Sequence, residues 1–191
     1  MYFNDYQKEA MRTAQGMNGN LLANGAMGLA GETAELAEVI SNYVFMVDGI
    51  TLKTNKFIEE AGDCLWYLAV ISEGIGISFS SVTGMLWQES FDNYQKRVFE
   101  SSCDRMSLFD EVLSLEINTG KCIDSIKKYL YQGHLLDKKS LKVKIELVLR
   151  ELAILSHKCG CKLSDIAENN VQKLKKRYPD GFSTEKSINR G

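Results

Sequence analysis

Two stretches decide the fold of this chain: Gly28-Leu-Ala-Gly-Glu-Thr-Ala-Glu-Leu-Ala-Glu38 and Glu59-Glu-Ala-Gly-Asp-Cys-Leu-Trp-Tyr-Leu-Ala69. In both, apolar residues recur three or four positions apart, which is the spacing of one face of an α-helix. The first series continues to Val47, and the second runs from Phe57 to Ile75. Both stretches therefore predict amphipathic helices whose apolar faces also carry acidic and small residues.

The same period extends along the chain and predicts an all-α bundle of about seven helices with short connections. The serine at each of three helix starts is the expected N-cap, because its hydroxyl can accept from a free backbone N–H. These serines are Ser78, Ser107 and Ser164. The single proline, Pro179, lies near the C-terminus, so the preceding chain can run in long helices. The predicted helices cover residues 4–17, 26–47, 55–75, 79–100, 107–131, 139–159 and 164–177.

Length and composition exclude several classes of protein. The 191 residues, of which 45% are hydrophobic, fit one all-α domain over residues 1–191. The net charge of −2 indicates no broad basic surface for binding nucleic acid. The sequence has no run of 18 apolar residues, so it predicts no membrane span. The first ten residues lack the apolar segment of a signal peptide. Five cysteines without a C-x-x-C pair favour reduced thiols and a cytoplasmic protein.

An internal repeat is predicted from identities at two fixed shifts. A shift of 86 places Ile40 on Ile126, and a shift of 84 places Gly76 on Gly160. The other matches at these shifts pair Glu38 with Asp124, Tyr43 with Tyr129, Leu68 with Leu152, Ala69 with Ala153, Ser72 with Ser156, Gln88 with Gln172 and Tyr94 with Tyr178. They predict two tandem pseudo-repeats, at about residues 20–100 and 107–182. The alternative is that amphipathic helices simply resemble one another.

Four acidic residues form the strongest chemical pattern. Glu32 and Glu35 are three residues apart, as are Glu60 and Asp63, so each pair lies on one helical face. Their neighbours are apolar, and a buried carboxylate needs a counter-ion. Facing carboxylates suit Mg²⁺ or Mn²⁺. Small residues should let the two helices approach closely, namely Gly28, Gly31, Ala34, Ala61 and Gly62.

Other readings of the acids stay open. The alternatives are a solvated acidic face and ion pairs with lysines, although residues 13–52 contain no lysine or arginine. A di-iron bundle would require Glu-x-x-His motifs, which His134 and His157 do not supply. Three aromatic residues are expected to be core residues rather than stacking platforms for a base; they are Trp66, Tyr67 and Trp87.

The acidic pattern resembles that of the MazG-like all-α nucleoside triphosphate pyrophosphohydrolases, which carry E-x-x-E, a spacer and E-x-x-D. Here Glu32-x-x-Glu35 and Glu60-x-x-Asp63 are separated by 24 residues. The resemblance extends to Tyr6–Ala14, Asn170–Phe182 and Ser187–Arg190. It implies hydrolysis of an NTP or dNTP between the α and β phosphates, giving a monophosphate and pyrophosphate.

The resemblance also implies roles for individual residues. Mg²⁺ would be held by Glu32, Glu35, Glu60 and Asp63, and Glu35 or Glu38 would orient or deprotonate the attacking water. Members of the family assemble as dimers or tetramers, so a fused pair of repeats would imitate a dimer, and a homodimer of this chain is a further expectation.

The predicted second copy lacks the acidic pattern. The shifts place Glu32 on Asn118, Glu35 on Lys121, Glu60 on Lys144 and Asp63 on Leu147. One metal site is therefore expected. The basic elements at the C-terminus of the family occur only in the second copy, so the resemblance suggests a composite site in which polar residues there contact phosphate or sugar. These residues are Asn170, Lys173, Arg177 and Tyr178. The alternatives are that residues 173–177 form a solvated basic run, and that the chain is a catalytically silent helical interaction or regulatory protein.

Overall fold

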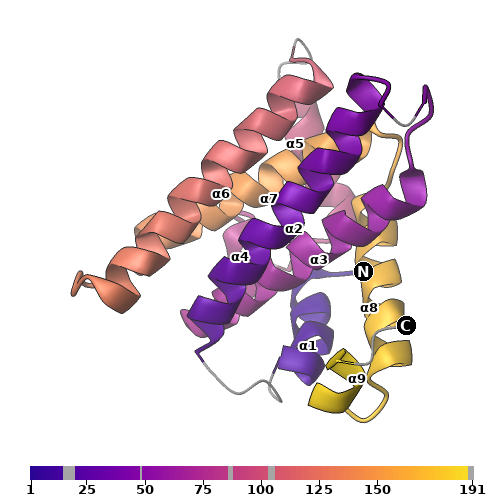
Figure 1. Ribbon diagram of the computed structural model, residues 1–191. Helices are drawn as coiled ribbons and strands as arrows, with labels where there is room; N and C mark the ends of the chain where they lie inside the picture. Colours follow the sequence, from indigo (N-terminus) through magenta and orange to yellow (C-terminus); the bar gives the residue numbers. More distant parts are fainter. Residues whose placement is uncertain (15–19, 48, 86–87, 103–105, 189–191) are drawn as a thin grey trace.

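The computed structural model describes residues 1–14, 20–47, 49–85, 88–102 and 106–188 (Figure 1). Within these ranges every helix or strand is an α-helix, as the sequence predicts. The helices are α1 (Phe3–Ala14), α2 (Leu21–Val44), α3 (Thr54–Gly74), α4 (Phe79–Val82), α5 (Phe91–Ser101), α6 (Leu108–Tyr131), α7 (Lys138–Lys158), α8 (Leu163–Arg177) and α9 (Thr184–Ile188). Residues 15–17 of the first predicted helix, Trp87 and Asn189–Arg190 lie outside the described residues. No helix in the described ranges is long and apolar enough to cross a membrane.

The prediction of one helix over residues 79–100 is wrong, because α4 and α5 occupy that range. With the short α9, which was not predicted, the described ranges hold nine helices rather than seven. The helix breaks after Val82, where Gly84 adopts a φ of +78° that favours glycine. The Ser90 hydroxyl then caps α5 by accepting from the N–H of Asn93. Arg97 fixes the connection between α4 and α5, because it donates to both carboxylate oxygens of the buried Glu89 at 3.1 and 2.9 Å.

Helix starts follow the capping residues only in part. Ser107 forms the expected capping box with Asp110, and Ser78 caps α4. Ser164 is not a cap, because α8 already begins at Leu163. The second helix starts earlier than predicted, at Leu21, since the Asn20 side chain accepts from the first N–H groups of α2.

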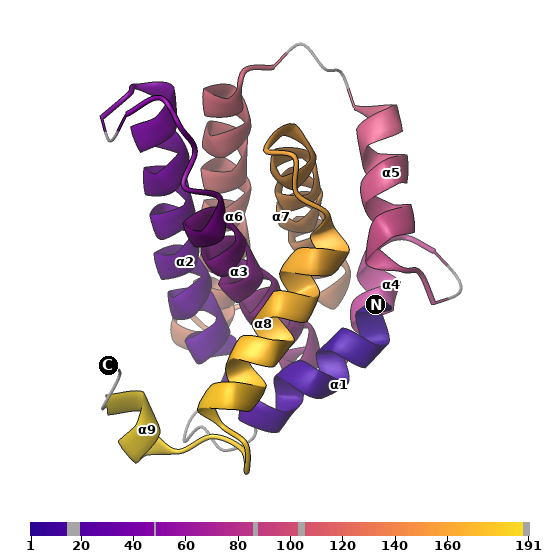
Figure 2. The ribbon, with the colours of Figure 1, turned by 90° about the vertical axis from the view of Figure 1, so that its right-hand side faces the viewer.

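The helices form three layers (Figure 2). Helices α2 and α6 lie side by side at one edge, α3 and α7 lie in the middle, and α1, α5 and α8 lie on the other side. Fully buried residues such as Leu29, Leu65 and Leu149 fill the space between the layers. This arrangement places α3 between α2 and α8, so that side chains from all three helices can meet.

The first and fifth helices make matching contacts. Gln7 on α1 donates to the carbonyl of Ile77 at 3.1 Å and accepts from the N–H of Phe79 at 2.7 Å. Gln95 on α5 makes the same two bonds with residues 84 positions further along, at 2.9 and 3.0 Å. The two glutamines therefore hold equivalent helix-to-helix connections in the two halves of the chain.

The starts of α1 and α5 also exchange backbone hydrogen bonds. The N–H of Phe3 donates to the carbonyl of Glu89, and the N–H of Phe91 donates to that of Met1, both at 3.2 Å. This exchange favours a division into α1–α4 and α5–α8. In that division Tyr94 on α5 corresponds to Tyr6 on α1. The pairing of Tyr94 with Tyr178 that the sequence predicted therefore does not fit this division. The internal duplication itself stays a prediction.

A buried pair of carboxyl groups lies between α6 and α7. Glu111 and Glu151 are 2% and 7% exposed and share a side-chain hydrogen bond. Lys158 lies 2.9 Å from Glu111, and Asn118 donates to Glu151 at 3.3 Å. Burial, followed by the charge of Glu111, raises the pKa of Glu151 to about 7. The fold therefore favours the protonated form of Glu151.

We expect Glu151→Gln to make the free energy of unfolding less dependent on pH. The raised pKa stabilises the folded state below the unfolded pKa of about 4.3, and this stability is lost as the pH rises through 7. At pH 8 the variant should therefore be more stable than the parent by on the order of 1–3 kcal/mol. Urea unfolding at pH 5 and pH 8 measures the difference, with the exposed Glu100→Gln as control. Parallel pH dependence of the parent and Glu151→Gln would contradict the expectation.

Candidate metal centre

Three of the four predicted acids meet at the contact between α2 and α3. Glu32 on α2 and Glu60 and Asp63 on α3 place carboxylate oxygens within 4.8 Å of one another. We call these three residues the acid cluster. Glu60 is buried, whereas Glu32 and Asp63 are half-buried. The cluster therefore combines oxygen donors from two helices at a place that solvent can reach.

Glycines allow the helices around the acid cluster to pack closely. A Cβ on Gly28 would lie 2.0 Å from the ring of Tyr67, and a Cβ on Gly62 would lie 3.0 Å from Asn170. Gly28 therefore makes room for α3 against α2, and Gly62 for α8 against α3. The sequence also predicted that Gly31 and Ala34 let the two helices approach closely. That prediction is wrong, because both residues are exposed and a Cβ on Gly31 would meet nothing within 4 Å.

Burial and crowding hold a proton in the acid cluster. Burial, followed by the charges of Asp63, Glu35 and Glu60, raises the pKa of Glu32 to about 8. Glu32 also shares a side-chain hydrogen bond with Glu60, whose pKa burial raises as well. At neutral pH the Glu32 carboxyl is therefore mostly protonated, and it must lose that proton before it can ligate a cation.

Glu35 lies to one side of the acid cluster. Its carboxylate is exposed and lies 3.7 Å from the ammonium of Lys56, which also pairs with Glu60. Lysine pairing, the alternative left open by the sequence, thus applies to part of this site. Sequence reasoning did not name Lys56. Its position four residues before Glu60 could have indicated the ion pair, because that spacing puts both residues on one face of α3.

The eighth helix completes the other side of the acid cluster. Lys173 donates to both oxygens of Asp63, at 2.7 and 2.6 Å, and Asn170 donates to the same carboxylate at 2.8 Å. The buried hydroxyl of Tyr6 donates to Asn170 at 2.9 Å. The structure therefore brings two of the predicted substrate residues into direct contact with the acid cluster. Sequence reasoning gave Tyr6 no role in the site, although the segment Tyr6–Ala14 was part of the family resemblance.

Arg177 and Tyr178 border a small cavity at the acid cluster. The cavity has a volume of about 70 Å³ and is also lined by Glu32, Asp63 and Tyr67. Tyr178 is almost fully buried. Trp66 is a core residue, as predicted, since it is buried and its indole N–H donates to the carbonyl of Ala10 at 3.2 Å. Tyr67 is only partly buried and faces the cavity, so it differs from the core prediction.

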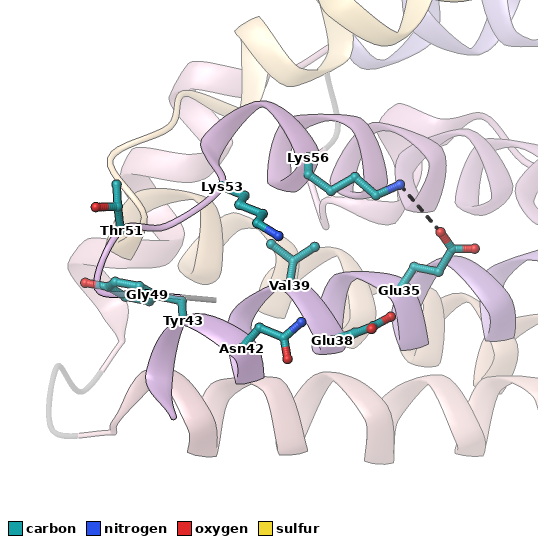
Figure 3. Close-up of a pocket in the computed structure, with 9 residues that line it drawn as sticks. All are labelled: Glu35, Glu38, Val39, Asn42, Tyr43, Gly49, Thr51, Lys53 and Lys56. Carbon is teal, nitrogen blue, oxygen red and sulfur yellow. Dashed lines mark ion pairs between the residues drawn. The ribbon is translucent and has the colours of Figure 1, made fainter. Parts of the chain in front are cut away.

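A second cavity, of about 180 Å³, lies on the far side of Glu35 (Figure 3). Glu35 and Glu38 reach it from α2, while Lys53 and Lys56 extend toward it from the start of α3. Glu38 is therefore placed beside these lysines and outside the acid cluster. Sequence reasoning did not predict Lys53 in the site. One cavity with a cationic side chain in its wall thus adjoins the acid cluster, and a second adjoins Glu35.

Comparison of the chain with models of known protein families, with curated proteins and with solved structures finds no significant match in any of the three.

Proposed function

We propose that this protein is a Mg²⁺-dependent nucleoside triphosphate pyrophosphohydrolase that releases pyrophosphate and a nucleoside monophosphate. One observation carries the proposal: carboxylates from two helices meet within 4.8 Å, and Lys173 and Arg177 of α8 lie beside them. A triphosphate needs a cation for charge neutralisation and basic side chains for positioning. The acid cluster and α8 offer both at one place.

The donors of the acid cluster fit a hard divalent cation. Carboxylate oxygens are the ligands that Mg²⁺ and Mn²⁺ prefer, and the cluster supplies three carboxyl groups. Burial and then the neighbouring carboxylates raise the pKa of Glu32, and a cation between the three groups would relieve the repulsion between them. Bound Mg²⁺ would supply charge neutralisation and a water of lowered pKa. Glu35 is the remaining predicted ligand, and Lys56 links it to Glu60.

The two lysines at the acid cluster have a second role in this proposal. Lys56 and Lys173 neutralise Glu60 and Asp63 in the protein alone. When a cation takes over that neutralisation, both ammonium groups can donate to phosphate oxygens instead. Arg177, in the wall of the adjoining cavity, can add a bidentate contact to phosphate. Tyr178 lines the same cavity, and Asn170 donates to Asp63 beside it.

Glu35 is the better of the two candidates for positioning the attacking water. Both carboxylates are exposed and line the second cavity, but Glu35 pairs with Lys56 and is thereby linked to Glu60, whereas Glu38 lies three residues further along α2. An exposed carboxylate can accept a hydrogen bond from water and take its proton during attack. Glu38 retains the alternative role of orienting the lysines across that cavity.

The activity is tested by incubating the full chain with each NTP and dNTP at pH 8.5 and measuring pyrophosphate and monophosphate. This pH lies above the raised pKa of Glu32, which is about 8. We expect pyrophosphate release with at least one nucleotide, dependent on Mg²⁺ or Mn²⁺ and abolished by chelator. Release of inorganic phosphate alone, or release that does not depend on metal, would contradict the proposal.

The second candidate is a catalytically silent helical protein that binds a partner. The ion pairs of Glu60 with Lys56 and of Asp63 with Lys173 favour it, because they satisfy the carboxylates without metal. In that case neither Mg²⁺ nor Mn²⁺ should raise the melting temperature, and no nucleotide should be hydrolysed. A metal-dependent rise would favour the hydrolase.

A further inference from the structure

The hairpin of α6 and α7 gives one end of the molecule a strong positive charge. Residues 121–144 contain seven lysines, two aspartates and no arginine, so their charge is +5 with histidine counted as neutral. The other 167 residues carry −7, since the whole chain carries −2. We call residues 121–144 the basic hairpin, and its turn projects away from the other helices at the lower left of Figure 1. Its lysines are Lys121, Lys127, Lys128, Lys138, Lys139, Lys142 and Lys144.

Two of these lysines stand where a helix does not favour them. Lys138 and Lys139 are exposed in the first turn of α7, which contains no acidic residue. The positive end of the helix dipole repels cations at that place. Asp137, the N-cap, accepts from the N–H of Ser140 at 3.0 Å and offsets only part of this repulsion. Within the described chain neither lysine forms an ion pair, so the stability of α7 does not explain them.

Ion pairs neutralise only a small part of the basic hairpin. Asp124 contacts both Lys127 and Lys128 at 2.6 Å, which leaves one positive charge on these three residues. Both lysine side chains are still about half exposed. Lys144 donates to Ser125, a neutral partner, and so keeps its charge. A positive potential therefore extends over both helices of the hairpin.

The turn of the basic hairpin presents apolar side chains to solvent. Leu135 is 95% exposed and Tyr131 is 73% exposed. Gly133 adopts a φ of +71°, and the N–H groups of Gln132 and His134 both donate to the carbonyl of Lys128. This geometry fixes the turn with Leu135 pointing outward. A single exposed leucine is ordinary, but here it lies at the tip of a projecting hairpin and among lysines on both helices.

The chemistry of the basic hairpin matches an anionic lipid surface. A group of about four to eight basic residues on a helix is typical of proteins that bind anionic headgroups. Lysine presents a point charge on a long apolar stem, which suits a diffuse anionic surface. Leu135 and Tyr131 can enter the headgroup region between the lysines. The acidic remainder of the chain would be repelled by the same surface, so the molecule would bind with the hairpin toward it.

Nucleic acid fits the basic hairpin less well. Arginine is the residue best suited to phosphate and to base edges, because its guanidinium makes two parallel hydrogen bonds, and residues 121–144 contain none. An outward-pointing Leu135 adds nothing to a phosphate contact, whereas a lipid bilayer can bury it. The observations therefore favour lipid over nucleic acid as the anionic partner.

We propose that the basic hairpin attaches the protein to the surface of bilayers that contain anionic phospholipid, with Leu135 inserted at its tip. This is attachment to the bilayer surface rather than a span, and it does not depend on the proposed hydrolase activity. A Cβ on Gly76 would lie 3.7 Å from Nζ of Lys138, so the hairpin lies beside the C-terminal end of α3. The acid cluster lies in the first half of α3, away from this end.

Cosedimentation of the full chain with lipid vesicles tests the proposal. The protein should bind vesicles of phosphatidylcholine and phosphatidylserine in a ratio of about 2:1, and should be released as the salt rises from about 0.1 M to about 0.5 M. Vesicles of phosphatidylcholine alone should bind it at least tenfold more weakly. No binding to the anionic vesicles, or equal binding to both kinds, would overturn the proposal. Release from the anionic vesicles by duplex DNA at equal phosphate concentration would also overturn it.

Removing two lysines tests whether the basic hairpin makes the contact. Lys138→Gln combined with Lys139→Gln should lower the partition coefficient about thirtyfold, because each lysine near an anionic surface contributes about fivefold. The melting temperature should not fall, since both changes remove a cation from the start of α7. Lys8→Gln combined with Lys96→Gln is the matched control, because both lysines are exposed and lie on α1 and α5. Equal losses for the two pairs would overturn the assignment to the hairpin.

A change at the tip tests the insertion of Leu135. Leu135→Gln should lower the partition coefficient about tenfold, since the bilayer no longer buries an apolar side chain. Ile117→Gln is the control, because Ile117 is 48% exposed but lies on α6 roughly 21 Å before Tyr131. Its partition coefficient should stay within about twofold of the parent. Unchanged binding by Leu135→Gln would contradict the insertion.

Discussion

Replacing Asp63 by Asn should lower the kcat/KM of Mg²⁺-dependent pyrophosphate release by at least about a thousandfold. Asp63 contributes one of the three carboxylates that lie within 4.8 Å of one another. The amide keeps the shape of the side chain but removes the negative charge that a divalent cation requires. The loss should come with a weaker affinity for Mn²⁺, which a titration in the absence of nucleotide measures. Glu60→Gln should act in the same way.

Glu59→Gln is the matched control for the Asp63 variant. Glu59 precedes Glu60 on α3 and lies 3.7 Å from Lys173, but it is not part of the acid cluster. Its replacement should change kcat/KM by less than about threefold, as expected for a partly exposed ion pair. A fully active, folded Asp63→Asn protein would rule out catalysis at the acid cluster.

Replacing Lys173 by Ala should raise the KM for nucleotide by about ten- to a hundredfold, the loss expected for one charge-assisted contact to phosphate. The same change should strengthen the binding of Mn²⁺ to the protein alone. Lys173 donates to both oxygens of Asp63, so its removal leaves that carboxylate without its main cation. The two effects have opposite signs, and a merely structural role for Lys173 would not produce both.

Lys175→Ala provides the comparison on the same helix. Lys175 pairs with Glu9 at 3.1 Å, away from the acid cluster, and its side chain is partly exposed. Both KM and the affinity for Mn²⁺ should stay near those of the parent. If Lys173→Ala also leaves KM unchanged, α8 has no part in binding the substrate.

Helical periodicity predicted the four long helices well, because their apolar faces pack against one another over many turns. The end of α3 near Gly76 and the capping box at Ser107 show that local signals also act in the folded chain. Periodicity failed between Val82 and Phe91, where apolar spacing suggested a continuous helix. There Gly84 and the contacts of Arg97 with Glu89 decide the backbone path, and these contacts form only in the folded chain.

The candidate site was predicted in part. Pairs of acids three residues apart on adjacent helices led directly to Glu32, Glu60 and Asp63. The same spacing did not show that Glu35 turns toward Lys56. Side-chain direction at this place depends on which residue of the neighbouring helix lies opposite, and spacing along one helix does not contain that information.

The contribution of α8 illustrates the other limit of sequence reasoning. Asn170 and Lys173 lie more than a hundred residues from Asp63 and contact it because α8 packs on α3 beside Gly62. Composition and periodicity contained no signal for this contact, and only the resemblance to a family motif suggested it. Tyr6, which donates to Asn170, lies in a segment that shares the resemblance, but it was given no role in the site.

The central claim is that the acid cluster binds a divalent cation, and a crystal structure with Mn²⁺ at pH 8.5 tests it most directly. The pH exceeds the pKa of Glu32, which burial raises to about 8. We expect an anomalous scattering peak roughly 2–2.5 Å from oxygens of Glu32, Glu60 and Asp63. Lys56 and Lys173 should then have moved away from their carboxylates. Unchanged ion pairs and no peak between the three carboxylates would contradict the claim.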